Sequence, residues 1–491
     1  MFAPLNIPPG VYRNGTNYQS LGRWFDANLV RWYAKTMRAV GGWVKSVDTQ
    51  MSGPGRGMTA WRSTAGSRLC AIGVPDNLYV WDDDSITDIT PAGFPSGKVD
   101  TFYGVGYGFG PYGAGPYGQT SGSGTKLDAT TWTLDNFGQV LIACASHDGT
   151  IYEWTPGDPA AVAVANAPEA RAIFVTQERI VVALGADGNA RKVMWSNQED
   201  REDWTADPLN QAGEILIQTT GNLLAGVRTR GENLLLTSTD AHTMRYLGPP
   251  YVYGFDRVGD NCGLISTLGV QPLEGGAAWM GFRNFYLFSG GVVRPLECDV
   301  HDYVFSDLNI AQAAKVCSGH VAQFGEIWWF YPSANSNVID RYVVWNYREN
   351  HWSIGTLARS CWIDAGIFLK PLAVSEDGYL YEHESGWTDD GSDRLTSIFA
   401  KSGPVEVGTG DRIMMVRQMI PDELTPMSWQ VRVATQFTPE GPAYDHGPYI
   451  CEPYTDMLFS GRQVAVQFEA IQDIDIRLGI CRFDGQPGAR R

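Results

Sequence analysis

A short strand–turn–strand pattern recurs through the middle of this sequence and restricts its fold more than any other feature. Two passages nearly repeat one another: SHDGTIYEW at 146–154 and SEDGYLYEH at 375–383 share S-x-D-G-x-[I/L]-Y-E. In each, Asp-Gly is typical of a tight turn, and the residues that follow alternate as in a strand. Such a unit cannot bury both of its faces alone, so it must pack on neighbours of the same kind.

Other strand pairs of the same order lie between these two passages. Each pair has an apolar strand, a turn and a second apolar or aromatic strand, with turns expected at 177–178, 231–232, 325–326 and 348–350. The spacing of about 35–50 residues is the period of a propeller blade. We therefore expect an all-β protein built on a β-propeller of six or seven blades over residues 56–395.

The two ends of the chain depart from this rhythm. Residues 1–55 form a basic and aromatic segment, which we expect to serve in docking, and residues 396–491 hold longer strands that alternate cleanly. Such alternation is typical of a β-sandwich with one wet face. We expect the N- and C-terminal segments to build a sandwich-like platform together. A short helix is expected at 306–316, and the segment 27–38 can be read as a helix or a strand.

An uncharged, Gly- and Tyr-rich insertion, FYGVGYGFGPYGAGPYGQTSGSG, occupies residues 102–124. It spells GxGxxG but lacks the strand–turn–helix context of a dinucleotide site. Two interpretations stay open: a surface loop with no single path, or a loop that orders against a partner. In the second case aromatic rings on a glycine-rich backbone would make the contact; they are Tyr107, Phe109, Tyr112 and Tyr117.

No catalytic arrangement stands out in the sequence. The seven histidines include no pair at i,i+3 or i,i+4, and neither HExxH nor GxSxG occurs. The acidic runs at 81–85 and 197–204 lack the spacing of a calcium loop and are interpreted as solvated turns. The eight cysteines are scattered without a CxxC pair, as expected of single buried thiols. We expect no catalytic residue, no cofactor, no metal site and no enzymatic activity.

Charge is distributed unevenly along the chain. The formal net charge is −17, although residues 1–62 carry a local +6. Such acidity argues against a body that grips nucleic acid, because duplex binding depends on Lys and Arg contacts with phosphate. We expect no signal peptide, because no basic stretch leads into an apolar run after Met1, and no apolar run reaches the length of a membrane span. We expect synthesis in a cytoplasm and no membrane span.

Three passages resemble a known family of virion proteins. They are KVMWSNQEDREDWTAD at 192–207, GEILIQTTGNLLAGVRTRGENLLLTSTDAHTMRYLGPP at 213–250 and EIWWFYPSANSNVIDRYVVWNYRENHWSIG at 326–355. Together they resemble the β-propeller tail nozzle proteins, or packaged DNA stabilisation proteins, of short-tailed bacteriophages. The resemblance implies a homo-hexameric ring in the virion tail, made in the host cytoplasm, below the portal and the adaptor protein. Such a ring would continue the DNA channel, retain the packaged genome and support fibres or spikes.

The charge pattern agrees with this resemblance. A strongly acidic channel would let DNA slide past without specific binding. The N-terminal segment holds side chains of the kinds that dominate protein interfaces, and we expect a partner interface at Arg23, Trp24, Arg31, Trp32 and Tyr33. Deleting residues 1–40 is expected to abolish head attachment and leave a folded propeller.

Two other functions are weighed against the tail nozzle. The first alternative is a carbohydrate- or receptor-binding β-propeller that stacks sugars on Trp and Tyr faces. The second, a glycoside hydrolase, is disfavoured because no paired carboxylates stand apart from the turn acids.

Overall fold

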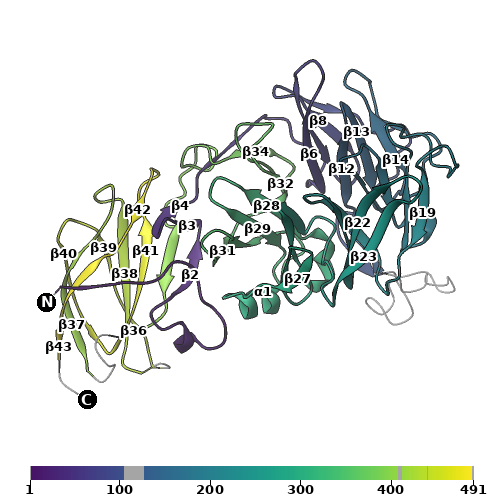
Figure 1. Ribbon diagram of the computed structural model, residues 1–491. Helices are drawn as coiled ribbons and strands as arrows, with labels where there is room; N and C mark the ends of the chain where they lie inside the picture. The colour runs from purple at the N-terminus through teal and green to yellow at the C-terminus, as the bar shows by residue number, and fades with distance from the viewer. Residues whose placement is uncertain (1, 104–125, 407–411, 439–440, 489–491) are drawn as a thin grey trace, which may run out of the picture.

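The computed structural model describes residues 2–103, 126–406, 412–438 and 441–488. The chain forms two lobes, and both of its ends lie in the same lobe (Figure 1). The other lobe is formed by the middle of the chain, so the propeller is inserted between the two halves of the platform.

Seven four-stranded antiparallel sheets make up the propeller lobe in the described residues. Blades 1 to 3 are β6 (Gly57–Arg62), β7 (Arg68–Gly73), β8 (Leu78–Trp81) and β9 (Ile86–Asp88); β12 (Trp132–Phe137), β13 (Val140–Ala145), β14 (Ile151–Trp154) and β15 (Val162–Ala163); and β16 (Ala172–Val175), β17 (Val181–Leu184), β18 (Lys192–Trp195) and β19 (Gly213–Leu216).

Blades 4 to 7 follow in chain order. They are β20 (Leu223–Arg228), β21 (Asn233–Thr237), β22 (Asp240–Gly248) and β23 (Val252–Asp260); β24 (Val270–Leu273), β25 (Gly276–Met280), β26 (Phe285–Ser289) and β27 (Val292–Pro295); β28 (Cys317–Val321), β29 (Glu326–Tyr331), β30 (Arg341–Asn346) and β31 (His351–Thr356); and β32 (Arg359–Ile363), β33 (Leu372–Ser375), β34 (Leu380–His383) and β5 (Trp43–Lys45).

The first strand of each blade contacts the first strand of the next. The contacts run from β6 through β12, β16, β20, β24, β28 and β32 and return to β6. The ring is therefore closed, and the expected β-propeller is confirmed with seven blades. Its last blade takes three strands from residues 359–383 and its outermost strand, β5, from near the N-terminus.

The two near-repeats occupy equivalent places in their blades. Each forms the turn between the second and third strands, β13–β14 in blade 2 and β33–β34 in blade 7. Gly149 and Gly378 have φ of 79° and 83°. Glycine reaches this left-handed region without the steric cost that a Cβ brings, which explains the Asp-Gly pair in both turns.

Two sheets and a small third sheet form the platform. One holds β1 (Phe2–Pro4), β43 (Arg482–Pro487), β37 (Met414–Ile420) and β40 (Thr455–Gly461); the other holds β2 (Trp24–Asn28), β35 (Phe399–Ser402), β41 (Gln463–Ala470), β38 (Trp429–Gln436) and β39 (Tyr444–Ile450), with β36 (Val405–Glu406) beside β41; the third holds β3 (Val30–Tyr33), β4 (Thr36–Ala39) and β42 (Arg477–Leu478).

N-terminal strands pair with C-terminal strands in every sheet of the platform. β1 pairs with β43, β2 with β35, and β4 with β42. The expected platform, built from both ends of the chain, is therefore present. The segment 27–38 contributes a strand hairpin, β3–β4, and not a helix.

The lobes share a hydrophobic core. One cluster of buried apolar side chains runs from Trp24 and Phe468 in the platform to Phe285, Trp329 and Trp362 in blades 5 to 7. Smaller clusters fill the spaces between the other blades. The 17 tryptophans all lie in the described residues, and each is buried except Trp387, which is half-buried.

Helix is scarce, and the helix expected at 306–316 is only partly correct. The α-helix α1 spans His301–Asp307, and a separate 3-10 helix, η3, spans Ile310–Lys315. The chain is extended at Leu308, which forms a β-bridge with Ser333. The Asn309 side chain then accepts a hydrogen bond from the Ala311 amide and begins the second helix. Two further 3-10 helices are η1 (Asn17–Ser20) and η2 (Ala186–Gly188).

The Gly- and Tyr-rich insertion leaves the propeller and returns at one place. β10 (Phe102–Tyr103) pairs antiparallel with β11 (Lys126–Leu127). Just before this hairpin, Gln312 of η3 exchanges two hydrogen bonds with the Thr101 backbone, each of 2.9 Å. The base of the insertion is therefore fixed to the propeller.

Candidate functional site

A cavity of about 430 Å³ lies on the propeller axis. The first strands of all seven blades, or the residues beside them, supply its walls. Its lining mixes apolar and polar side chains, including Phe174, Trp362, Asp135, Arg228 and His320. A pocket of this kind is the usual first candidate for a ligand or active site.

The polar groups on one side of the cavity join neighbouring blades. The Ile173 amide donates to Thr133 Oγ1 at 2.9 Å, and the Val175 amide donates to Asp135 Oδ2 at 2.8 Å. Arg228 donates from Nη2 to Asp135 Oδ1 at 2.9 Å. Burial raises the pKa of Asp135, and the Arg228 charge and the backbone donors oppose that rise. One carboxylate therefore links β12, β16 and β20.

Side chains on the opposite side of the cavity also form hydrogen bonds between neighbouring blades. Gln271 Nε2 donates to the Ser318 carbonyl at 2.9 Å. The Ala322 amide donates to Asp364 Oδ2 at 2.9 Å, and His320 Nδ1 lies 3.2 Å from the same oxygen. These side chains close the ring through bonds between strands, and His320 and Asp364 also line the cavity.

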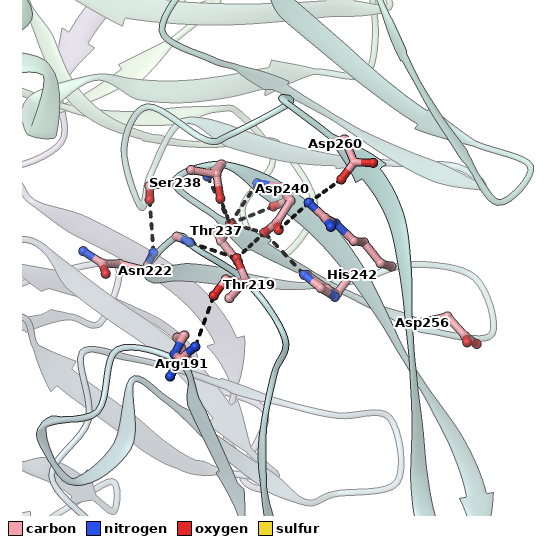
Figure 2. Close-up of polar contacts among 12 residues, drawn as sticks. Arg191, Thr219, Asn222, Thr237, Ser238, Asp240, His242, Asp256 and Asp260 are labelled. Atoms are coloured by element: carbon pink, nitrogen blue, oxygen red, sulfur yellow. Dashed lines mark hydrogen bonds and ion pairs between the residues drawn. The ribbon is translucent and has the colours of Figure 1, made fainter.

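A second polar cluster surrounds Asp240 in blade 4 (Figure 2). The Asp240 side chain is fully buried. Its Oδ1 accepts hydrogen bonds from Thr219 Oγ1 at 2.7 Å and Thr237 Oγ1 at 2.5 Å. Its Oδ2 lies 3.1 Å from Arg257 Nη2, and Oδ1 lies 3.3 Å from His242 Nε2. The carboxylate thus ties β21, β22 and β23 to the loop that enters blade 4.

The geometry of this cluster does not suit nucleophilic catalysis. Catalysis by a hydroxyl requires a base that can take its proton. Here both threonine hydroxyls donate to the Asp240 carboxylate, and all three residues are buried, so a substrate could not reach either hydroxyl. Burial lowers the pKa of His242, and Asp240 counteracts this. The cluster is a structural anchor.

The acidic runs form turns, as expected. Asp82 Oδ1 accepts from the Ser85 amide at 2.8 Å between β8 and β9. In the loop between β18 and β19, Asp200 Oδ1 accepts from the Glu202 amide at 3.0 Å, and Glu199 pairs with Arg179 at 3.2 Å. Within the described residues, no group of three or more His, Cys, Asp or Glu side chains could hold a metal ion.

Most of the predicted interface residues near the N-terminus lie inside the chain's own fold. Trp24, Arg31 and Trp32 are 6%, 3% and 2% exposed, so in the folded chain they do not present a surface to another molecule. Arg23 and Tyr33 are half-buried. Tyr107, Phe109, Tyr112 and Tyr117 lie outside the described residues.

Arg31 instead joins the platform to the propeller. Its Nε lies 3.2 Å from Glu326 of blade 6, and its Nη2 lies 2.6 Å from Glu384, next to blade 7. Its guanidinium also lies 3.8 Å from the Phe324 ring centroid. Burial opposes the charge on Arg31, but the two carboxylates outweigh it and raise its pKa. Because Trp24 and Trp32 share the core of these blades, deleting residues 1–40 would uncover apolar side chains of the propeller.

A second contact holds together the two chain crossings between the lobes. Arg394, which precedes β35, donates to the carbonyls of Val40 and Gly41 at 2.9 and 3.1 Å. Its guanidinium lies 4.7 Å from the Trp43 ring centroid, and Arg359 lies 5.0 Å from the same ring. We call Trp43, Arg359, His383 and Arg394 the clasp.

His383 is the titratable centre of the clasp. Arg359 donates from Nε to His383 Nε2 at 2.8 Å, so this imidazole is neutral with its proton on Nδ1. Burial lowers its pKa well below the ordinary value, and the Arg359 and Arg394 charges lower it further. Sequence reasoning missed this residue. The available signal was the last position of the near-repeat, where His383 replaces the Trp154 of blade 2.

Comparisons with known proteins concern the fold alone. No family model and no curated protein matches the chain. A solved structure described as YCF48 bound to D1 peptide is 8% identical, with a TM-score of 0.38, and the match covers 70% of this chain and 97% of that one. BamB from Moraxella catarrhalis is 10% identical, with a TM-score of 0.37, and the match covers 68% and 97%.

None of the helices in the described part of the chain has the length and apolar character of a membrane-spanning segment.

Proposed function

We propose that the protein is a structural component of a bacteriophage tail. In this role six copies form a nozzle ring below the portal and the adaptor, continue the DNA channel, retain the packaged genome and support fibres or spikes. The proposal starts from the sequence resemblance of residues 192–250 and 326–355 to tail nozzle proteins. It includes the absence of enzymatic activity.

The observation that carries the proposal is the extensive contact between platform and propeller. Both ends of the chain are paired in the platform, a common core crosses to blades 5 to 7, and the Arg31 ion pairs and the clasp reinforce the joint. A ring component under the pressure of a packaged genome needs such a joint, because force applied to one lobe must reach the other.

The polar clusters support a mechanical role. Asp135 and Asp240 are occupied in bonds between strands. The net charge of −17 per chain would give a six-copy ring about −100. DNA would then pass such a wall by repulsion, without specific binding.

The alternative of a sugar-binding propeller loses the tryptophans as stacking faces, whereas Tyr251 and Tyr454 are 78% and 63% exposed. Sugar stacking needs aromatic faces that solvent can reach, whereas the tryptophans are buried, with Trp387 half-buried. The tyrosines of the insertion lie outside the described residues and do not decide the question.

Phage particles assembled without this chain test the proposal. We expect heads that package DNA and then lose it, and expect the purified protein to restore DNA retention. Antibody against the chain should label the tail of wild-type particles. Particles that hold their DNA and infect without the chain would contradict the proposal, as would binding of the chain to a saccharide together with its absence from particles.

A further inference from the structure

The axial cavity presents a guanidinium that uses few of its hydrogen-bond donors. Arg228, the last residue of β20, lines the cavity, and its side chain is 47% exposed. Its Nη2 donates to Asp135 Oδ1 at 2.9 Å, but its Nε and Nη1 donate to no group in the described part of the chain. A guanidinium with free N–H groups matches the geometry of a carboxylate.

Asp135 holds this guanidinium in place and has little capacity left for a ligand. Its Oδ1 also accepts from the Asn136 amide at 2.8 Å, and its Oδ2 accepts from the Val175 amide at 2.8 Å. The residue is only 8% exposed. Asp135 is therefore a positioning residue, and Arg228 is the group that a ligand would contact.

The opposite side of the cavity offers acceptors. Gln271 donates from Nε2 to the Ser318 carbonyl, whereas its Oε1 accepts no hydrogen bond from any described residue. The Asp364 side chain is 19% exposed, and its Oδ1 accepts from the adjacent Ala365 amide alone. Arg228 belongs to blade 4 and Asp364 to blade 7, so the two face each other across a ring of seven blades.

The charges of the lining favour a ligand that carries both signs. Arg228 is the one cation among the lining residues that is always charged, and Asp135 and Asp364 are the two carboxylates, so the lining has a net charge of −1 when His320 is neutral. A ligand with only a carboxylate would add a further negative charge. An ammonium group on the same ligand removes that excess, and uncompensated charge in a partly enclosed site is costly.

The size and the walls of the cavity suit a small molecule with an aliphatic body. Its volume of about 430 Å³ lies in the range of small-molecule sites. Leu134, Val227 and Trp362 supply apolar surface between the polar groups.

We propose that the axial cavity binds a small ω-amino acid, with its carboxylate on Arg228 and its ammonium group beside Gln271 and Asp364. The separation of these groups on opposite sides selects a ligand whose charged ends are apart. All of the contacts come from one chain, so this site goes beyond the proposed ring function and does not depend on it.

Isothermal titration calorimetry with four probes tests the class of ligand. The probes are γ-aminobutyrate, ε-aminocaproate, caproate, which lacks the ammonium group, and hexylamine, which lacks the carboxylate. At least one amino acid should bind, and caproate should bind roughly tenfold more weakly than ε-aminocaproate. Hexylamine should show no binding that depends on Arg228. Failure of both amino acids to bind at millimolar concentration would overturn the proposal, as would equal affinities for caproate and ε-aminocaproate.

Substitutions of Arg228 test the carboxylate contact. Arg228→Gln should weaken the binding of the amino acid by roughly tenfold or more. Arg228→Lys keeps a charge beside Asp135, so it should fold even if the glutamine variant does not, and it should still weaken binding because lysine lacks the planar fork. Arg245→Gln is the matched control, since Arg245 lies on β22 of the same blade, pairs with Glu232 and is not part of the lining. Affinity at the wild-type level in the folded Arg228 variants would overturn the site.

Asp364→Asn tests the ammonium contact. The amide keeps the size of the carboxylate but removes its charge. The variant should therefore lose the preference for ε-aminocaproate over caproate and still bind caproate. An unchanged preference would contradict the placement of the ammonium group, whereas the DNA-retention experiment decides the ring function separately.

Discussion

At the scale of single residues, buried charges hold this propeller together. Asp135 and Asp240 each accept hydrogen bonds from several strands and pair with an arginine. A buried carboxylate is costly unless such partners satisfy it. Both residues resemble catalytic acids by their burial alone, but their partners show that they organise the backbone.

Asp240→Ala should destabilise the protein strongly. The substitution leaves the buried Thr219 hydroxyl without its acceptor and removes the carboxylate that pairs with Arg257, at a cost of about 3 kcal/mol in the free energy of unfolding. Asp256→Ala, on the neighbouring strand β23, is the control, because its carboxylate is exposed. Urea unfolding followed by circular dichroism measures both, and equal effects of the two substitutions would refute the structural role of Asp240.

His383 should make the protein sensitive to acid. Its pKa in the folded chain lies well below the ordinary 6.5. Above pH 6.5 His383 is neutral in both the folded and the unfolded chain, so its low folded pKa does not reduce the free energy of unfolding. As the pH falls below 6.5, the unfolded chain binds a proton that the folded chain does not, so stability decreases until the folded pKa is reached.

His383→Gln isolates this effect from that of the other buried histidines. Glutamine can still accept the Arg359 hydrogen bond but does not titrate. Thermal unfolding between pH 7.5 and 5 should therefore show a flatter dependence for the variant than for the wild type. Each pKa unit between the states corresponds to about 1.4 kcal/mol. Parallel curves for the two proteins would show that His383 is not buried as described.

At the scale of elements, strand β5 closes the propeller and begins the joint with the platform. Its Trp43 is 4% exposed, contacts Arg359, His383 and Arg394, and donates a hydrogen bond to Asp389. The strand therefore completes blade 7 and holds the crossing between the lobes.

Trp43→Ala should show whether the Trp43 side chain, and not only the backbone pairing of β5, holds the crossing between the lobes. Removing the buried indole should cost about 3–5 kcal/mol and make residues 384–398 more accessible to limited proteolysis. Val44→Ala is the control, because Val44 lies on the same strand and is 41% exposed; it should change stability by less than about 1 kcal/mol. Equal proteolysis of both variants would argue against a clasp.

The elements that the sequence predicted well are those set by local chemistry. Asp-Gly at 148–149 and 377–378 dictates a tight turn between alternating strands, and the blades follow from the period of such turns. The helix at 306–316 was misplaced because a distant partner, Ser333, draws Leu308 into a bridge.

Contacts between residues far apart in the sequence also explain why the surroundings of the candidate site residues could not be predicted. The pairing of β5 with β34 joins residues more than 330 positions apart, and no local pattern records it. Trp24, Arg31 and Trp32 have the composition of an interface, and the structure uses them as an interface within one chain. Composition alone cannot distinguish these two uses.

At the scale of the whole molecule, the chain is a two-lobed body with a closed propeller and a platform made from both chain ends. A groove lined by Met415, Tyr444 and Leu458 lies on the platform.

Native mass spectrometry of the purified chain, alone and bound to phage heads, tests the central claim most directly. The chain has a mass of 54.0 kDa. We predict an assembly of six copies, present in the free protein or formed on the heads. A chain that stays monomeric in both conditions and binds no head would contradict the claim.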